Sequence, residues 1–466
     1  MFELDPKQWA QATFGDCALG DRRRTKRLVD YAAREAESGA RSTSRACAGD
    51  AAAAEGAYRL MRNENVDPGA IAEGGFQATV EAARECGVVL AIEDSTTLGF
   101  EHSAAEELGD LGGPGGTNSR GFWVHSVLLV DGDTEMTVGL VHQQRWVRDP
   151  DERRGSKVLR KPTDAKESEK WQFASECVGE RMGDLMLRTI SVCDREADIY
   201  EYIAFKVESG QRFIVRSCND RVTETSRTLW SAAKSSKKLG TIQIVVHQRG
   251  GKHARVKREV DLAVRAKAVT VRAPKYLGAG IASIELWAIH AVEEHPAKGT
   301  KPLEWLILTS EPCEQLEAAQ TVLRYYARRW RIEDFHKAWK SGCGVEERRM
   351  QTADNLERIA VMLAFLAVRT LQLNELVSKE PERPCDVILA DDEWHCLWIS
   401  TEKSPPPKKA PNALWARNAI ARLGGWLDTK RTGRVGSSTM ADGWLRLMDK
   451  LDGFRAAMAI FGAVKM

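Results

Sequence analysis

Two apolar segments that each end in an aspartate constrain the fold of this chain most strongly. The segment GVVLAIED covers residues 87–94, and LMLRTISVCD covers residues 185–194. Strand and helix patterns alternate around them, which predicts an α/β fold. Because functional side chains gather at the carboxyl ends of strands in such folds, Asp94 and Asp194 are candidate site residues. Aspartates at strand ends are also common turn formers and helix caps, so neither residue is diagnostic by itself.

The other patterns divide the chain into parts of different character. Residues 1–70 are predicted to be helical, and two paired strands are expected at 122–130 and 136–144. The stretch 211–310 is predicted to be β-rich. The remaining expectations are a charged, exposed excursion at 150–170, long helices at 314–340 and 354–378, a linker at 401–411 and amphipathic helices after it.

Charge is distributed unevenly along a nearly neutral chain. The composition, with 43% hydrophobic and 29% charged residues, is that of a globular protein, and 466 residues suggest about three domains. The net charge is only +2, but residues 21–62 hold ten basic and six acidic side chains, and residues 324–340 hold six and two. Local basic surfaces suit an anionic polymer. Charge alone does not distinguish such a surface from a solvated one.

Several classes of protein lack support in the sequence. No CxxC pair occurs among the ten cysteines, and the histidines form no metal-binding spacing such as HExxH. The glycine-rich stretch 109–121 is not a phosphate-binding loop, so no nucleotide cofactor is expected. The N-terminus lacks an apolar signal core, and the apolar run 359–368 is too short to cross a membrane. We therefore expect a cytoplasmic protein with no membrane role.

The predicted helix at 21–37 carries an arginine stripe. Arg23, Arg27 and Arg34 fall on one face, opposite an apolar face that begins with Leu28 and Val29. A helix of this kind could bind the DNA backbone or a groove. An ordinary surface helix with unengaged arginines would have the same pattern.

The predicted helix at 314–340 presents a carboxylate among cations. Its polar face is made by Tyr326, Arg329, Glu333, Lys337 and Lys340. An acid surrounded by cations is what phosphodiester chemistry requires, since the acid can hold a divalent metal ion while the cations bind phosphates. The bland alternative is that Arg329 and Glu333 form an i,i+4 ion pair on a solvated helix.

With these residues in place, the sequence resembles a known family, the DDE transposases of bacterial insertion sequences. It is similar to the transposon-five-like subgroup, whose signature Tyr-x2-Arg-x3-Glu-x6-Lys is complete here as Tyr326, Arg329, Glu333 and Lys340. Other similar segments include ALGDRRRTKRLV (18–29), LAIEDSTTL (90–98), CDREADIY (193–200), EWLILTSEP (304–312) and RWRIEDFHKAWKSG (329–342). The likeness covers nearly the whole chain, but the excursion at 150–170 is longer than in the family and the segment 380–410 diverges.

The resemblance implies a fold, a metal site and a domain plan. The fold would be a ribonuclease-H-like α/β core with an inserted β-rich subdomain, plus helical N-terminal and C-terminal domains. Asp94, Asp194 and Glu333 would be the catalytic acids and would hold two Mg²⁺ or Mn²⁺ ions. The expected domains are a DNA-binding domain at 1–70, a catalytic domain at 71–375 and a dimerisation domain at 376–466.

The resemblance also implies DNA contacts. Tyr326, Arg329 and Lys340 match contacts to phosphates beside the scissile bond, and His336 and Lys337 are further candidates on the same helix. Trp305 matches a tryptophan that stacks on a base flipped out of the transposon end, although a strand tryptophan is by default a core residue. The remaining candidates are Arg27 and Arg59 in the N-terminal domain and, more weakly, Arg216, Arg349 and Asn355.

The implied activity is cut-and-paste transposition of double-stranded DNA. A homodimer would pair two transposon ends, cut each end through a hairpin intermediate and join the 3′ ends to target DNA. Two alternatives remain open, a DNA-binding regulator that does not cut and a general nuclease of the same fold. A glycosidase built on a carboxylate pair is disfavoured, because its chemistry does not require the cations around Glu333.

Overall fold

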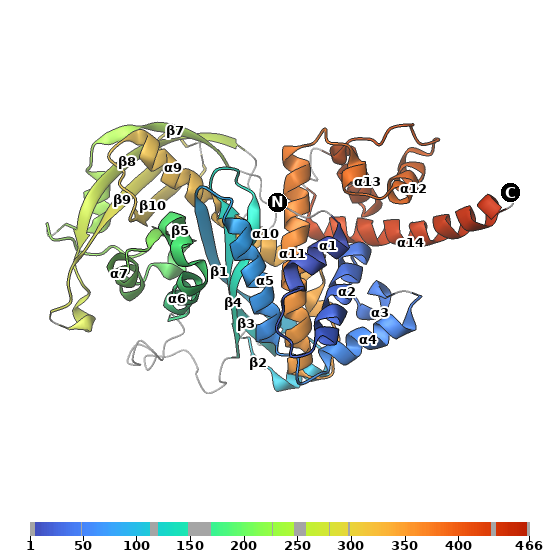
Figure 1. Cartoon of the computed structure of the whole chain (residues 1–466). Helices are drawn as coiled ribbons and strands as arrows, with labels where there is room; N and C mark the ends of the chain where they lie inside the picture. Colours follow the sequence, from blue (N-terminus) through green and yellow to red (C-terminus); the bar gives the residue numbers. More distant parts are fainter. Residues whose placement is uncertain are drawn as a thin grey trace.

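The computed structural model describes residues 5–47, 49–111, 120–147, 169–225, 227–246, 258–278, 280–296, 299–429 and 435–463. Figure 1 shows a large twisted sheet on one side, a long central helix, α11, and helical N- and C-terminal parts packed around that helix. The predicted excursion at 150–170 falls almost wholly outside the described residues, as does most of the glycine-rich stretch at 109–121.

The N-terminal part is helical up to the sheet, as predicted. Its elements are α1 (Pro6–Phe14), α2 (Arg22–Ser38), α3 (Thr43–Ala46), α4 (Ala51–Met61) and α5 (Pro68–Ala83). Helix α2 begins after Asp21, whose side chain accepts the Arg23 N–H, and ends at Gly39 in the left-handed conformation. Leu28 and Val29 are buried as expected, whereas Arg23 and Arg27 are exposed. The basic face of α2 is therefore open to solvent.

The central sheet has the strand order of a ribonuclease-H-like core. Its strands are β1 (Val89–Phe100), β3 (Arg120–Asp131), β4 (Thr137–Trp146), β5 (Thr189–Cys193) and β6 (Arg212–Arg216). They lie in the order β4-β3-β1-β5-β6, with β1, β5 and β6 parallel and with β3 antiparallel to its neighbours. This arrangement confirms the predicted α/β fold and places the end of β5 beside the middle of β1, where Asp94 lies.

The β-rich insertion extends the same sheet. Its strands are β7 (Lys238–Val246), β8 (Arg258–Val271), β9 (Ile284–Glu293) and β10 (Glu304–Thr309), and α8 (Leu229–Lys234) packs on it. Strand β10 pairs antiparallel with β6, and the order continues through β9 and β8 to β7. A short strand β2 (Gly109–Asp110) adds to β3 at the other side, which gives ten strands over the described residues.

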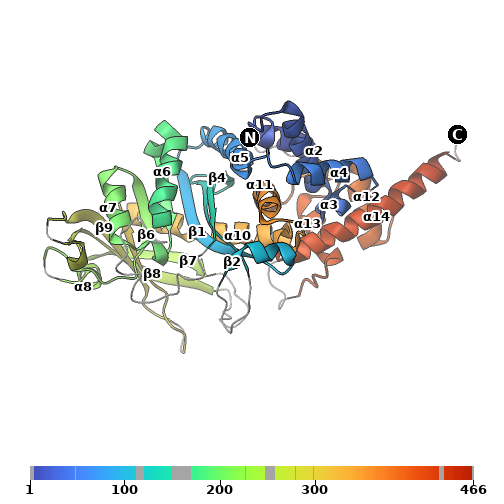
Figure 2. The same cartoon turned by 90° about the horizontal axis from the view of Figure 1, so that it is seen from below.

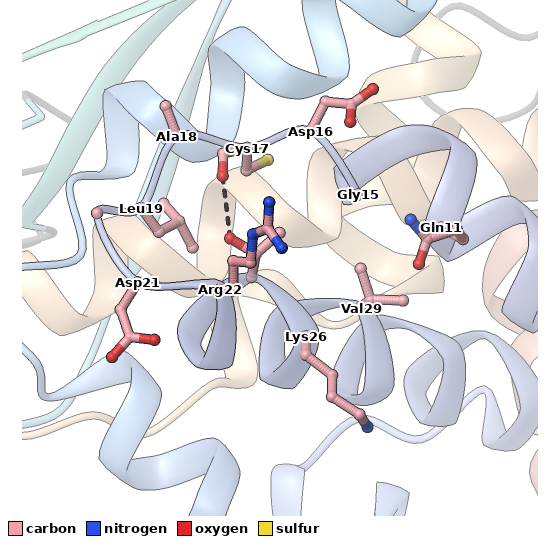
Figure 3. Close-up of a pocket in the computed structure, with 12 residues that line it drawn as sticks. Gln11, Gly15, Asp16, Cys17, Ala18, Leu19, Asp21, Arg22, Lys26 and Val29 are labelled. Atoms are coloured by element: carbon pink, nitrogen blue, oxygen red, sulfur yellow. Dashed lines mark hydrogen bonds between the residues drawn. The ribbon is translucent and has the colours of Figure 1, made fainter.

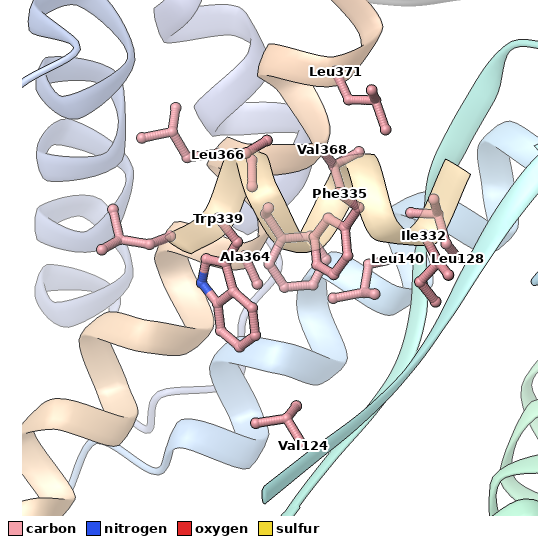
Figure 4. Close-up of a cluster of buried hydrophobic side chains, with 14 of the residues drawn as sticks. Val124, Leu128, Leu140, Ile332, Phe335, Trp339, Ala364, Leu366, Val368 and Leu371 are labelled. Carbon is pink, nitrogen blue, oxygen red and sulfur yellow. The ribbon is translucent and has the colours of Figure 1, made fainter. Parts of the chain in front are cut away.

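Helices cover both faces of the core sheet (Figures 1 and 2). One face packs against α5, α6 (Lys170–Met182) and α7 (Tyr200–Glu208). The other face packs against α9 (Leu316–Ala327), α10 (Arg331–Lys337) and α11 (Ala353–Lys379). Figure 4 shows Ile332, Phe335 and Trp339 lying between the strands and α11. By length and composition α11 could cross a membrane, but 78% of its most apolar window is buried in the protein.

The C-terminal part consists of α12 (Asp391–Glu402), α13 (Ala413–Leu423) and α14 (Ser437–Ala463). The predicted linker at 401–411 begins in the last turn of α12 and continues as the connection to α13. Leu447 and Leu451 of α14 are buried, and Trp444, Met448 and Phe454 pack on the same cluster, so the predicted apolar stripe is core. The last turns of α14 extend away from the rest of the protein towards the C-terminus (Figure 1).

Three predicted elements differ in extent. Strand β1 continues six residues past Asp94, because β3 pairs with it as far as Phe100. Residues 183–188 form a 3-10 turn instead of the start of a strand. The helix predicted at 314–340 is interrupted by a 3-10 turn at Arg328–Trp330 and ends in a π-turn at Ala338–Gly342. The domain boundaries at 70 and 375 stay predictions.

Trp339 is the side chain on which the packing of α10 against α11 depends. It is fully buried, stacks on Phe335 with ring centroids 5.9 Å apart and donates its indole N–H to the Ala360 carbonyl. We expect Trp339→Ala to lower the free energy of unfolding by about 3–5 kcal/mol, measured by urea denaturation. Leu187→Ala, at an exposed position, is the control. A midpoint no lower than that of the control would contradict this packing.

Candidate active site

Asp94 lies inside β1 and faces α10. The sequence placed it at the end of a strand, but the strand runs on to Phe100. Asp94 stands opposite Ser126 of β3, and its side chain is 18% exposed. Oδ1 accepts the N–H of Ser95, which leaves Oδ2 directed at Arg329, 3.4 Å away. The carboxylate is thus held in a largely buried position on the face of the sheet that α9, α10 and α11 cover.

Asp194 directly follows β5, as predicted. Strand β5 is parallel to β1, so the two aspartates come from neighbouring strands. Oδ1 of Asp194 accepts the N–H of Glu196 at 2.7 Å and caps the short 3-10 turn that follows the strand. Asp194 therefore does act as a helix cap, which was one of its two predicted roles, and this hydrogen bond orients its carboxylate.

Glu333 reaches the same place from the helical layer. It lies in the first turn of α10, and Oε1 accepts a hydrogen bond of 2.7 Å from Arg329. Arg329 is 7% exposed and contacts both Glu333 and Asp94. The i,i+4 pair suggested by the sequence is present, but it is half-buried and points at the sheet. One guanidinium therefore bridges a strand carboxylate and a helix carboxylate.

The charges of Asp194 and Glu333 both act on Asp94. Burial, followed by the charge of Asp194 and to a lesser extent that of Glu333, raises the pKa of Asp94 to about 7, against the lowering effects of Arg329 and of the Ser95 N–H. A carboxyl pKa this high means that like charges and desolvation act on one group. Such a group gains from a nearby cation, and displaced pKa values of this kind mark functional sites.

The donor set suits a divalent metal ion in its chemistry. Carboxylate oxygens are the ligands that Mg²⁺ prefers, and a cation would offset the charges of Asp194 and Glu333, which add to the effect of burial on the pKa of Asp94. In the described residues, no three His, Cys, Asp or Glu side chains are arranged closely enough to hold a metal ion as they stand. Arg329 takes the place of a cation between Asp94 and Glu333. Binding of a metal ion would require Arg329 to move aside.

An aromatic and basic group lies beside the acids. Tyr326 is 5% exposed, and its ring meets Trp305 of β10 edge-on with centroids 5.4 Å apart. Burial raises the pKa of Tyr326, while the nearby charges of Arg216 and Arg329 lower it. Arg216 ends β6 and donates to the Glu304 carbonyl. Strand β10 of the insertion thus brings Trp305 beside Tyr326, and Arg216 lies at the end of the neighbouring core strand β6.

The three cationic or imidazole candidates on α10 and its π-turn diverge. Lys337 is exposed and lies 3.8 Å from Asp334, whereas Lys340 is half-buried near Glu346, and burial lowers its pKa. A π-turn at Ala338–Gly342 follows Lys337 and contains Lys340, and the two lysines differ in burial. His336 is buried, and burial together with Lys340 lowers its pKa to about 3. It stays neutral at physiological pH.

The other candidate DNA contacts lie away from the acids. Arg27 of α2 passes beside Gly56 of α4, and Arg59 of α4 is exposed and paired with Glu55. Arg349 is exposed, but Asn355 is buried and its side-chain oxygen accepts from Arg358, which leaves it poorly placed for DNA.

A pocket in the N-terminal part, lined by residues of 11–29, lies near exposed Lys26 (Figure 3). None of the predicted site residues is among the residues that line it.

Two features near the acids were not singled out from the sequence. Trp330 is 43% exposed, and the Arg329 guanidinium lies 4.9 Å from the centre of its ring. On the opposite face of the sheet, Glu93, His125 and Lys206 form a buried ionisable group directly behind Asp94. The position of Trp330 directly after Arg329 could have indicated a role near the site. Nothing local indicates that the second group would assemble.

Comparison with known proteins gives two family matches. Residues 6–66 match the family model described as transposase DNA-binding, and residues 178–369 match the one described as transposase DDE domain. Asp194 and Glu333 lie within the second match, and Asp94 lies outside it. Among solved structures, the piggyBac transposase in a synaptic complex with hairpin DNA is similar over 81% of this chain and 76% of that chain, with 10% identity and a TM-score of 0.41. Similarity this low supports no argument about function.

The raised pKa of Asp94 predicts a pH-dependent stability. The folded protein keeps the proton on Asp94 up to about pH 7, whereas the unfolded chain releases it at about pH 4. Ionised Asp94 therefore destabilises the folded state increasingly as the pH rises through this window. In chelator, we expect Asp94→Asn to be more stable than wild type at pH 8, by on the order of 2–4 kcal/mol, and to show no gain at pH 4.

Asp334→Asn is the matched control, since Asp334 is exposed beside Glu333. Thermal or urea unfolding at several pH values gives the measurement. A stability difference between Asp94→Asn and wild type that does not vary with pH would refute the electrostatic strain at this site.

Proposed function

We propose that this chain, a DNA-binding transposase with a DDE catalytic domain, excises a DNA element at its inverted-repeat ends and joins the 3′ ends to target DNA. The observation that supports this most directly is that Arg329 contacts both Asp94 and Glu333 while the charge of Asp194 acts on Asp94, although the three acids are 100 or more residues apart in the chain. The signature residues around Glu333 further support membership of the transposon-five-like subgroup.

The proposed catalytic residues are the three acids. Asp94, Asp194 and Glu333 would hold two divalent ions, Mg²⁺ or Mn²⁺. When bound, these ions lower the pKa of an attacking water and neutralise charge on the leaving oxygen. Arg329 now neutralises two of the acids, so we propose that it turns outwards to a DNA phosphate when the site is loaded.

The residues around the acids would position DNA. Arg329, Tyr326 and Lys340 would bind phosphates beside the scissile bond, with His336 and Lys337 as weaker candidates on the same helix. Arg349 is exposed and stays a weaker candidate for DNA elsewhere. Because His336 is buried and neutral, it would act as a hydrogen-bonding group and not as a cation. Arg216 at the end of β6 and Trp305 of β10 are further candidate DNA contacts. The edge-on contact of Trp305 with Tyr326 would hold its ring ready to stack on a base that leaves the duplex.

The proposed reaction is a series of phosphodiester exchanges. Water first attacks the phosphorus at the element end, which breaks the bond to O3′ and leaves a 3′ hydroxyl on the element. That hydroxyl attacks the opposite strand, displaces the flanking 3′ oxygen and closes a hairpin. A second water opens the hairpin, and the 3′ hydroxyls finally attack target DNA. The two transesterification steps exchange one phosphodiester bond for another, so no nucleotide cofactor is needed.

Recognition and pairing of the ends would fall to the two helical parts. Arg27 and Arg59 lie on the adjacent helices α2 and α4, where an exposed basic face can follow a DNA backbone. The last turns of α14 expose Met458 and Ile460 at 60% and 63%, which suits contact with a second copy. We propose a homodimer in the bacterial cytoplasm that holds two ends, each cut by the partner subunit.

The acids provide the decisive test of this function. We expect Asp94→Ala and Glu333→Ala to reduce nicking of the gene's own inverted-repeat DNA in Mg²⁺ by about 10³-fold or more, while DNA binding persists. Asp334→Ala is the matched control, because Asp334 adjoins Glu333 but is exposed. Gel analysis of labelled end DNA gives the rate. Wild-type nicking by either acid variant would falsify the assignment.

The same assay separates the alternatives. A wild-type protein that binds ends with a steep salt dependence and never nicks them would be a regulator. A protein that nicks ends but never joins them to a second duplex would be a general nuclease. Joined products identify a transposase.

Trp305 is expected to act at the hairpin steps. Removing a stacking ring weakens base capture by roughly 1–3 kcal/mol, about a 5- to 150-fold effect. Trp305→Ala should therefore slow hairpin formation or opening more than the first nick, measured by time courses on labelled ends. Trp398→Ala, a half-buried tryptophan in α12, is the control. An equal loss at every step would indicate structural damage instead.

A further inference from the structure

A short connection after the π-turn contacts three parts of the molecule. Residues 343–350 join the end of the Glu333 helix to α11. Gly344 there has a left-handed φ of +61°, and a Cβ at this position would lie 2.9 Å from the Arg41 side chain. The chain therefore turns tightly against the N-terminal part. We call residues 343–350 the connector.

Arg348 of the connector is buried inside the N-terminal part. It is 2% exposed, and its guanidinium donates two parallel hydrogen bonds of 2.8 and 2.9 Å to Glu35 of α2. It also donates to the carbonyls of Ala40 and Cys343. Glu35 is completely buried and accepts a further hydrogen bond from Tyr31. The two residues are 313 positions apart in the chain.

The connector also contacts the strand that carries Asp94. Glu346 accepts the backbone N–H of Gly99 near the end of β1, at 2.9 Å. The ring of His102, just beyond β1, lies 3.0 Å from the Arg348 carbonyl oxygen. Glu346 further acts on Lys340 electrostatically. One connector thus touches α2, the end of β1 and the helix end that carries Lys340.

A buried ion pair at this place is not explained by stability alone. Removing two charges from water is costly, and apolar side chains of similar volume often pack at least as stably. What the Arg348–Glu35 pair does supply is direction, because a guanidinium and a carboxylate bind in one plane with two parallel bonds. The pair therefore fixes the orientation of α2 relative to the connector more strictly than an apolar contact would.

Helix α2 bears the exposed Arg23 and Arg27 on its outer face and Glu35 on its inner face. Arg348 thus links α2 to the connector, which contacts the end of β1 and follows the helix of Glu333. We propose that Glu35 and Arg348 are positioning residues that couple DNA binding on α2 to alignment of the active site in the same subunit. This inference rests on the proposed function.

If cutting occurs in the partner subunit's active site, the coupling has a defined consequence. A subunit would align its acids only when its own N-terminal part holds an end. Cutting would then await the pairing of two loaded subunits, since each active site acts on the other's DNA. A lone end bound to one subunit would not be cut.

Three variants of the pair test the coupling in the full-length protein. Arg348→Lys keeps the charge but loses the two-pronged geometry, and Glu35→Gln keeps the shape but loses the charge. The double variant Glu35→Gln with Arg348→Gln leaves no unpaired charge and guards against unfolding. The control is Arg45→Gln, which removes an exposed ion pair to Asp449 that also links the N-terminal part to α14.

The probe is a duplex carrying the inverted repeat that flanks the gene. We expect each pair variant to bind it within about threefold of wild type, yet to nick it about a hundredfold more slowly at saturating DNA, since small misplacements are costly in catalysis. Amide hydrogen exchange gives the second readout. In wild type, the duplex should slow exchange in α2 and in residues 331–350. In the variants, only α2 should be slowed.

The outcomes separate this inference from the proposed function. Variants with wild-type nicking, or with exchange at 331–350 still slowed by DNA, would overturn the coupling. Binding, nicking and melting temperature that all fall in step would also overturn it, because a merely structural role acts on all three. If wild type binds the duplex without nicking it, the proposed function fails, but the exchange readout still decides whether the two parts are coupled.

Discussion

The convergence of buried negative charge at one point of the sheet governs much of this structure. Burial, together with the charges of Asp194 and Glu333, raises the pKa of Asp94 to about 7, and the Arg329 guanidinium opposes this rise. Repulsion of this kind persists only where the surrounding packing opposes it. On the helix side, the stacked rings of Phe335 and Trp339 hold the helix of Glu333 in place. On the sheet side, the parallel pairing of β1 with β5 fixes the backbones that carry Asp94 and Asp194.

The helical layer also joins parts of the chain that are distant in sequence. Helix α11 lies at the centre of the molecule (Figure 1), and its Arg358 donates to the carbonyls of Met61 and Val66 in the N-terminal part. Arg331 and Glu375 tie α10 to α11, and Glu375 also accepts from Thr137 of β4. The N-terminal helices, the sheet and the glutamate helix therefore share one core, so that changes in one are felt in the others.

The sequence predicted those parts of the fold and site that depend on local pattern. Strand pairs, the apolar helix α11 and the placement of Asp194 after a strand follow from periodicity and from turn chemistry. The length of β1 could not be predicted, because it depends on how far β3 pairs beyond Asp94. The π-turn that separates Lys337 from Lys340 has no signal in helical periodicity. Contacts such as Arg329 with Asp94 join residues 235 positions apart, and single-sequence patterns hold no information about them.

The continuity of the sheet across β6 has a consequence for exchanging parts between related proteins. Strand β10 meets β6 with Ile307 opposite Arg216, and the alternation of side chains along β10 is what turns Trp305 towards Tyr326. Because strands alternate with a period of two, a graft joined one position out of step would carry that indole to the opposite side of the sheet. A recombinant insertion must therefore preserve the pairing frame at this seam, whatever it changes at the distant edge formed by β7.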